Sequence, residues 1–92
     1  MLRHIVLIKT DCPHEVDRLV AAVPGFIGRV PGLLQVEVGR DRTGLTRGYD
    51  RGFVMTFDGP DGLAAWDVHP DHDPIRSALM AVSEMIVFDY EV

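Results

Sequence analysis

The chain has 92 residues, which is enough for one domain and too few for two, so the sequence predicts a single domain over residues 1–92. Hydrophobic residues make up 47% of it, although a chain of this size has only a small core to fill. We therefore expect the surplus to form a subunit interface or an apolar cavity. The net charge of −5 argues against nucleic-acid binding, because phosphate contacts require a concentrated basic surface.

Two features of the sequence indicate the cellular compartment, namely the single cysteine and the N-terminal segment. Cys12 has no second cysteine to pair with, so nothing suggests an oxidising compartment. The apolar run near the N-terminus is too short to span a membrane and lacks the small-residue cleavage site of a secretory signal. We therefore expect a cytoplasmic protein that binds neither a membrane nor nucleic acid.

The first predicted elements are a strand and a helix. Residues 3–9 read RHIVLIK, which is apolar on both faces and typical of a central strand that is covered on each side. Pro13 suits the first turn of a helix, with Asp11 as a cap before it. Apolar residues then recur at helical spacing and predict a stripe that faces the sheet, with a break at Pro24-Gly25. The stripe consists of Val16, Leu19, Val20, Val23, Ile27 and Val30.

Two strands follow, joined by a charged loop. Residues 33–39 alternate between apolar and polar side chains, which predicts a half-buried strand with Leu34 and Val36 on its apolar face. Residues 40–48 are polar and contain several glycines and arginines, so they predict a loop. Residues 49–57 return to a strand pattern, and a connection of this length favours an antiparallel pair.

A second helical segment and a last strand complete the chain. Residues 58–62 are expected to open the helix, which stops at His69-Pro70 because a residue before proline disfavours helical geometry. Asp73-Pro74 has the pattern of a cap followed by a first-turn proline, so the helix is expected to resume there. Residues 85–92 alternate and predict the final strand.

The order β-α-β-β-α-β predicts an α+β fold of the ferredoxin-like type, with a four-stranded antiparallel sheet and both helical segments on one face. The other face would be polar in a monomer, yet the first, third and last strands are apolar on both sides. An uncovered apolar sheet indicates an interface. We therefore expect a homodimer in which two sheets pack face to face and only together enclose a barrel with a cavity.

The densest group of polar side chains is the segment His69-Pro70-Asp71-His72, at the predicted helix break. Two histidines beside acidic residues suggest a metal site, but a zinc site needs three or four ligands, and the other soft ligands, Cys12 and His14, lie at the start of the first helix. We therefore expect no metal. His69 has a structural alternative, in which its imidazole binds backbone groups of the turn. His72 is the better catalytic candidate, because a small apolar cavity keeps an imidazole neutral and basic.

The remaining candidates come from the strands and the second helix. His4 lies among apolar residues and is either a core histidine or part of the cavity wall. Tyr49 either donates a hydrogen bond to a carbonyl or only packs its ring. Arg51 either binds an anionic substrate or stays solvated on an edge strand, and Trp66 belongs to the core, the interface or the ligand site. The predicted catalytic residues are His4 and His72, and the predicted substrate-binding residues are Tyr49, Arg51, Trp66 and His69.

Several stretches resemble one family, the stress-responsive A/B barrel (Dabb) domain of the dimeric α/β barrel superfamily. The motifs that carry the resemblance run from end to end of the chain in the family's order. They are RHIVL at residues 3–7, PGLL at 31–34, VGR at 38–40, RGY at 47–49, FVMTF at 53–57, HPDH at 69–72 and VFDY at 87–90. The resemblance implies a ferredoxin-like protomer and a homodimer whose sheets form the barrel.

The resemblance implies less about activity. Some relatives are stress-induced plant proteins, and one plant branch is a polyketide cyclase that performs an aldol condensation without a cofactor. In that branch the histidine that matches His72 is the general base, and a tyrosine on the preceding helix assists it. Trp66 stands at the tyrosine position here, and Arg51 stands where that enzyme has a further histidine. His4 and His72 are the groups that survive the comparison.

Three functions remain open, none of which requires a cofactor. In the first, the barrel binds a small apolar, aromatic or polyketide-like molecule, and His72 removes a proton next to a carbonyl while His4 and Tyr49 position the oxygen. In the second, the same pocket serves a cofactor-free monooxygenase of an aromatic substrate. In the third, the protein is not an enzyme, and the dimer itself acts in stress response or in interaction with other proteins.

Overall fold

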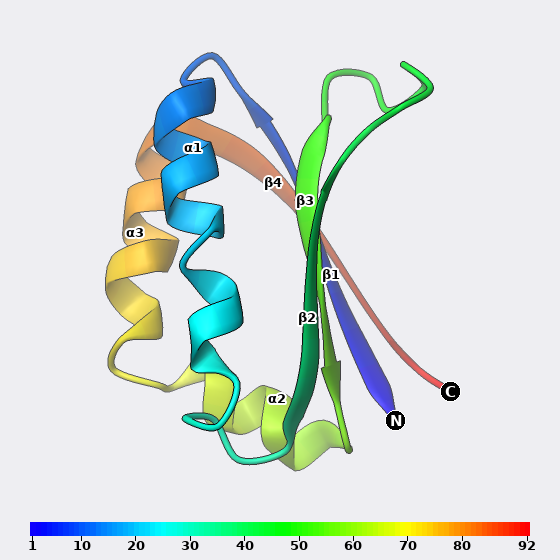
Figure 1. The fold of residues 1–92 in the computed structure, drawn as a ribbon, viewed down its shortest axis with the longest axis vertical. Coiled ribbons are helices and arrows are strands. Elements are labelled where there is room, and N and C mark those ends of the chain that lie inside the picture. Colours follow the sequence, from blue (N-terminus) through cyan, green and yellow to red (C-terminus); the bar gives the residue numbers. More distant parts are fainter.

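The computed structural model describes all 92 residues and has two layers, a sheet and a layer of helices on one of its faces (Figure 1). The elements in chain order are β1 (Leu2–Thr10), α1 (Pro13–Val20), the 3₁₀ helix η1 (Val23–Phe26), β2 (Leu33–Arg40), β3 (Arg51–Phe57), α2 (Pro60–Asp67), α3 (His72–Val82) and β4 (Ser83–Glu91). The predicted order and the ferredoxin-like α+β fold are confirmed. No helix is both long enough and apolar enough to cross a membrane.

The sheet has the order β2-β3-β1-β4, and every neighbouring pair is antiparallel. The strand that is apolar on both faces, β1, is central, as predicted. Residues directly opposite one another in such a pair share a face of the sheet. His4 of β1 lies opposite Asp89 of β4. Val6, two residues further along β1 and therefore on the same face as His4, lies opposite Phe53 of β3. This register turns His4, Phe53 and Asp89 towards the helices.

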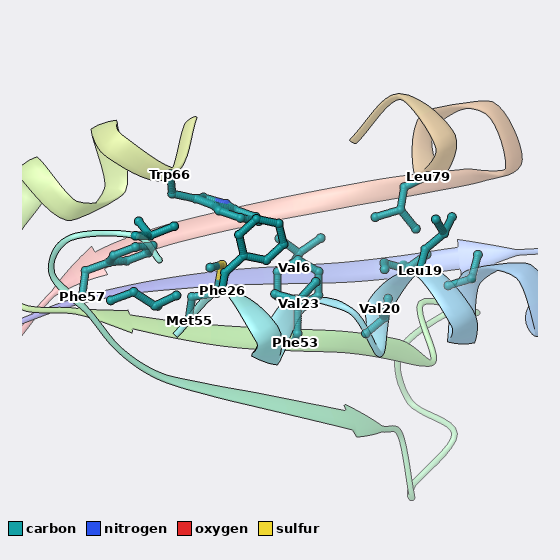
Figure 2. Packing of buried hydrophobic residues seen from close by; sticks show 14 of the residues in the cluster. Val6, Leu19, Val20, Val23, Phe26, Phe53, Met55, Phe57, Trp66 and Leu79 are labelled. Atoms are coloured by element: carbon teal, nitrogen blue, oxygen red, sulfur yellow. The ribbon is translucent and has the colours of Figure 1, made fainter. Parts of the chain in front are cut away.

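The core lies between the sheet and the helices (Figure 2). Its largest fully buried side chains include Phe57, Met55 and Ile8 from the sheet, and Trp66 of α2 is 2% exposed. Ile27 was predicted to join this core, but it is 46% exposed. The helical geometry ends with η1, and the extended backbone at Ile27 (φ −59°, ψ 128°) breaks the helical spacing on which the prediction rested.

Both predicted helix caps are wrong, for local reasons. Cys12 precedes α1, and no side chain caps the helix; instead the Cys12 N–H donates to Thr10 Oγ1 at 2.8 Å. Helix α3 begins at His72, so Asp73 lies inside its first turn and binds Arg76 at 2.6 Å. The turn before α3 is closed by the His72 N–H, which donates to the His69 carbonyl at 3.0 Å, and the helix continues from there.

Strand β2 departs from the predicted alternation. A register shift, or bulge, lies between Leu33 and Gln35, so Leu33 is buried while Leu34 is 52% exposed. A bulge places two residues of one strand against one of its partner, which changes the face of the extra residue. The prediction that Leu34 faces the core was therefore wrong, whereas Val36, opposite Met55, keeps its predicted face.

The face of the sheet that carries no helices is apolar along its centre and one edge. It presents side chains from β1, β3 and β4, with Phe88 60% and Ile86 47% exposed. Its apolar residues are Ile5, Leu7, Val54, Ile86, Phe88 and Tyr90. The prediction that these three strands are apolar on both sides is confirmed. A continuous apolar surface of this kind indicates an interaction surface.

Candidate functional site

A cavity of about 490 Å³ lies between the sheet and helices α2 and α3. Most of its wall is apolar, and Val6, Phe53 and Leu79 are among its lining residues. It therefore lies on the helix-covered face of the sheet, within one chain. The sequence predicted a cavity enclosed by two copies, but the cavity that His4 and His72 line lies within one chain, because the register of β1 and β4 turns His4 towards the helices rather than towards the open face.

His72 is the first residue of α3 and lines this cavity. Its Nδ1 lies 2.9 Å from the backbone oxygen of Trp66, and its ring stacks on the Trp66 indole with centroids 3.8 Å apart. Because a carbonyl oxygen only accepts hydrogen bonds, Nδ1 must carry the proton, and the lone pair is on Nε2. Burial lowers the pKa of His72, and the hydrogen bond to the Trp66 carbonyl opposes this to a smaller extent.

His4 lines the same cavity from the middle of β1. Its Nδ1 lies 2.5 Å from Oδ1 of Asp89, and its ring centroid is 6.5 Å from that of Phe53. Among buried side-chain nitrogen and oxygen atoms, only Trp66 Nε1 lacks a hydrogen-bond partner. Neither His4 Nε2 nor His72 Nε2 has a partner in the chain, so both must reach accessible space rather than being sealed in the core.

Trp66 forms a wall between the cavity and the core. Its indole packs edge-on against Phe26 of η1, with centroids 4.8 Å apart, and Figure 2 shows the two rings in contact above the sheet. The indole N–H is buried and donates to nothing. The structure therefore brings together three of the predicted site residues, His4, Trp66 and His72, from β1, α2 and α3.

Tyr49, Arg51 and His69 do not line this cavity. Tyr49 donates to Glu84 Oε2 at 3.3 Å, and Arg51 donates to Asp17 Oδ1 at 2.7 Å. Both border a separate, shallower hollow of about 390 Å³ near the start of β3. The phenol expected to position a substrate oxygen beside His72 is thus absent from the cavity, because the Tyr49 hydroxyl binds Glu84 of β4 at the separate hollow.

His69 follows the structural alternative considered for it. Its Nδ1 accepts a hydrogen bond from the Asp71 N–H at 3.1 Å, and its ring packs edge-on against Phe26. It stabilises the turn between α2 and α3, and its contacts are with the backbone and the core. No group of three or more His, Cys, Asp or Glu side chains is arranged to hold a metal ion.

Asp89 is the cavity residue that sequence reasoning missed, together with the charged pair Asp67 and Arg76. The sequence pattern indicates the face on which Asp89 lies but not its partner. Residues 85–92 alternate, which places Asp89 on the face opposite Phe88, but only the register of β4 on β1 brings it beside His4.

The sequence matches the family described as the stress responsive A/B barrel domain over residues 2–92. The chain belongs to this family. A stress-response A/B barrel domain-containing protein of Arabidopsis thaliana is 28% identical over 88 residues, which cover 92% of this chain and 79% of the relative. The family predicted from the motifs is thereby confirmed.

Solved structures of this A/B barrel fold are similar over nearly the whole chain. A dimeric ferredoxin-like protein of unknown function from Jannaschia sp. is 27% identical, with a TM-score of 0.88 over 99% of this chain and 98% of that one. SnoaB, a cofactor-independent oxygenase from Streptomyces nogalater, is 17% identical, with a TM-score of 0.80 over 99% of this chain and 91% of that one. At that identity, the similarity to SnoaB shows the fold alone.

Proposed function

We propose that this A/B barrel protein is a homodimer that binds a small apolar or aromatic molecule in the cavity of each chain, and that His72 removes a proton next to a carbonyl group of that molecule. One observation carries the proposal. The Nδ1 proton of His72 is committed to the Trp66 carbonyl, which leaves the Nε2 lone pair free in the wall of an apolar cavity.

The surroundings of His72 suit a general base. A general base is most effective when it is unprotonated near neutral pH and lies within hydrogen-bond reach of the proton that it takes. Burial lowers the pKa of His72, so the neutral imidazole predominates at neutral pH. The stacked Trp66 ring and the carbonyl contact hold the imidazole in one orientation, which preorganises Nε2 towards the cavity.

The size and lining of the cavity support an apolar ligand. Small-molecule sites usually measure about 300–1,000 Å³ and are lined mainly by apolar side chains with a few polar groups. The cavity, at about 490 Å³ and with 10 hydrophobic residues among 16 in its wall, fits that description. A flat bicyclic ketone is a suitable probe of this space.

The proposed step balances without a cofactor. His72 Nε2 takes a proton from the carbon next to the carbonyl, the C–H electron pair forms a C=C bond, and the carbonyl π electrons move to oxygen. The enolate carbon then attacks a second carbonyl of the same molecule in a cyclase-like reaction, and the π electrons of that carbonyl move to its oxygen, which takes the proton held by His72. The carbon–carbon bond forms from electrons already present in the substrate.

A cofactor-free oxygenase is the second candidate, favoured by the similarity of fold to SnoaB. It begins with the same proton removal. The carbanion then reduces O₂ and a C–O bond forms, so oxygen is consumed with the substrate. Oxygen uptake therefore distinguishes the two reactions after a shared first step.

Dimerisation is supported by the apolar open face and by the dimeric state described for the Jannaschia protein. In a dimer the exposed side chains of Phe88 and Ile86 become buried, which provides hydrophobic stabilisation that a small single core lacks.

Proton removal can be tested with 2-tetralone in D₂O. We expect the protein to accelerate deuterium incorporation at C1 over the buffer rate, as followed by proton NMR. His72→Gln should lower the protein-catalysed rate by about 100-fold or more, because it removes the general base. The control is His14→Gln, which changes an exposed histidine at the start of α1.

The exchange rate of His72→Gln tests the general base, and oxygen uptake, measured with an oxygen electrode, distinguishes the two reactions. Equal exchange rates in the wild type and His72→Gln, or a wild-type rate no faster than buffer, would overturn the role of His72. Oxygen uptake that parallels loss of the ketone would favour the oxygenase, and exchange without uptake would favour the cyclase-like reaction.

A further inference from the structure

The cavity holds a second imidazole whose hydrogen-bond partner differs from that of His72. His4 Nδ1 binds the carboxylate of Asp89 at 2.5 Å, whereas His72 Nδ1 binds a neutral backbone carbonyl at 2.9 Å. The His4 side chain is 13% exposed, and that of Asp89 is 38% exposed on the edge strand β4. The two imidazoles therefore face one cavity with different electrostatic support.

We propose that His4 and Asp89 act as one oxyanion-binding unit, an imidazolium paired with a carboxylate whose Nε2–H donates to the carbonyl oxygen of the substrate. The proposal rests on the function proposed above, because the oxygen becomes negative when His72 takes the neighbouring proton. It makes Asp89 a positioning residue and assigns the substrate class as enolisable ketones on a flat apolar body.

The carboxylate performs two tasks in this unit. By accepting from Nδ1–H, Asp89 orients the ring so that Nε2 lies away from β4, and Phe53 packs against the ring. Its negative charge also compensates the positive charge of an imidazolium next to an apolar cavity. A neutral His4 in this orientation accepts at Nε2, so donation to an oxygen requires the ion-pair form.

The other polar side chains of the wall are committed elsewhere. Arg76 donates to Asp67 at 2.9 Å and to Asp73 at 2.6 Å, and the Trp66 N–H is buried away from accessible space. His72 offers a lone pair rather than a proton at Nε2. His4 Nε2 is therefore the side-chain donor available to an oxygen in this cavity.

The paired roles balance. His72 Nε2 gains the proton from carbon, and the oxygen gains a hydrogen bond and then the proton from His4 Nε2. His4 is left neutral, with its Nδ1–H still on Asp89, and the enol formed returns its proton to His4 Nε2 when its carbon attacks the second carbonyl. His72 thus acts as the base and His4 as the acid in one cavity.

Binding of two ligands that differ by one oxygen atom tests the His4–Asp89 unit without any catalytic turnover. The probe 2-naphthol resembles the enol of 2-tetralone, and naphthalene has the same rings without the oxygen. We expect wild-type protein to bind 2-naphthol at least about tenfold more tightly than naphthalene, as measured by NMR titration, because of the charged hydrogen bond. In the complex, nitrogen-15 NMR should show protons on both ring nitrogens of His4.

Asp89→Asn is the main variant, since it keeps the shape of the side chain and removes the charge. We expect it to abolish the preference for 2-naphthol while leaving naphthalene binding unchanged, and His4→Gln to do the same. The matched control is Glu91→Gln, which removes the same charge from an exposed position two residues further along β4. Glu91 faces the same side of the sheet, opposite Leu2.

Each outcome is decisive. The oxyanion unit is overturned if Asp89→Asn still prefers 2-naphthol over naphthalene, or if it loses affinity for both ligands equally. It is also overturned if His4 Nε2 carries no proton in the wild-type complex, a nitrogen-15 result that needs no variant. A preference without any deuterium exchange of 2-tetralone rejects the role of His72 and leaves the oxyanion unit standing. If the wild type binds neither ligand, both proposals fail.

Discussion

His72 and His4 are the same residue type with two different hydrogen-bond partners, a backbone carbonyl and a carboxylate. His72 is partly buried and its Nδ1 binds a carbonyl oxygen, whereas His4 is held by a carboxylate from a neighbouring strand. Both rings line one cavity, so the partner of Nδ1 is the main difference between them. Substitutions at the partners should therefore alter function without removing either imidazole.

The lowered pKa of His72 has a consequence for stability. Between its folded value and the ordinary value of about 6.5, the unfolded chain binds more protons than the folded chain. The stability that depends on neutral His72 is therefore fully present above about pH 6.5 and is lost as the pH falls towards the folded pKa. We expect His72→Gln to reduce the difference in the free energy of unfolding between pH 7.5 and pH 5.5.

Urea denaturation at both pH values, at one protein concentration, measures this difference. His14→Gln is the matched control, because it removes an exposed histidine. A pH dependence that is as steep in His72→Gln as in the wild type would contradict the burial argument.

At the scale of elements, the packing of β3 against β1 depends on a glycine. A Cβ at Gly52 would lie 2.4 Å from the backbone oxygen of Val6, well inside contact distance. A Cβ at Gly39, its cross-strand neighbour on β2, would have no other atom within 4 Å. The same residue type thus occupies a crowded position on an inner strand and an open position on an edge strand.

We expect Gly52→Ala to lower the free energy of unfolding by about 1–3 kcal/mol, because backbone of the central strand must shift. Gly39→Ala should leave stability unchanged or raise it slightly, since the added methyl reduces the freedom of the unfolded chain. Urea denaturation of both variants tests the contrast. Equal effects of the two substitutions would show that the close approach to Val6 does not matter.

At the scale of the whole molecule, the two faces of the sheet differ in what they carry. The helix-covered face carries the cavity, and the open face carries the exposed apolar residues of β4. Loss of the proposed dimer would leave the polar groups of the cavity in place, because all of them come from one chain. Assembly and chemistry can therefore be tested separately.

Phe88→Arg should convert the proposed dimer into a monomer with a mass close to 10.2 kDa, because it places a charge within the apolar surface. Size-exclusion chromatography with light scattering measures the mass. Met80→Arg is the control, since Met80 is a 65% exposed apolar residue on α3. A wild-type monomer, or a dimer that persists in Phe88→Arg, would contradict the assignment of this surface.

The sequence by itself determined the strands and helices, their order, the central place of β1, the two apolar faces of the sheet and the family. These properties follow from side-chain periodicity and short motifs, which are local. It also singled out His72, because a histidine after a helix break is visible in the chain. The predicted caps were wrong because other hydrogen bonds, from the Cys12 N–H to Thr10 and from the His72 N–H to His69, form before the two helices. The face of Leu34 was wrong because of the bulge in β2, which the residue pattern does not reveal.

Only the tertiary structure decided where the cavity lies and which residues meet in it. His4 and Asp89 are 85 residues apart in the chain, and they touch because the register of β4 on β1 sets them opposite each other. Tyr49 and Arg51 bind Glu84 and Asp17 instead and border a separate hollow. Alternation says that a side chain belongs to one of two faces, but the face that the helices cover depends on how the whole chain packs.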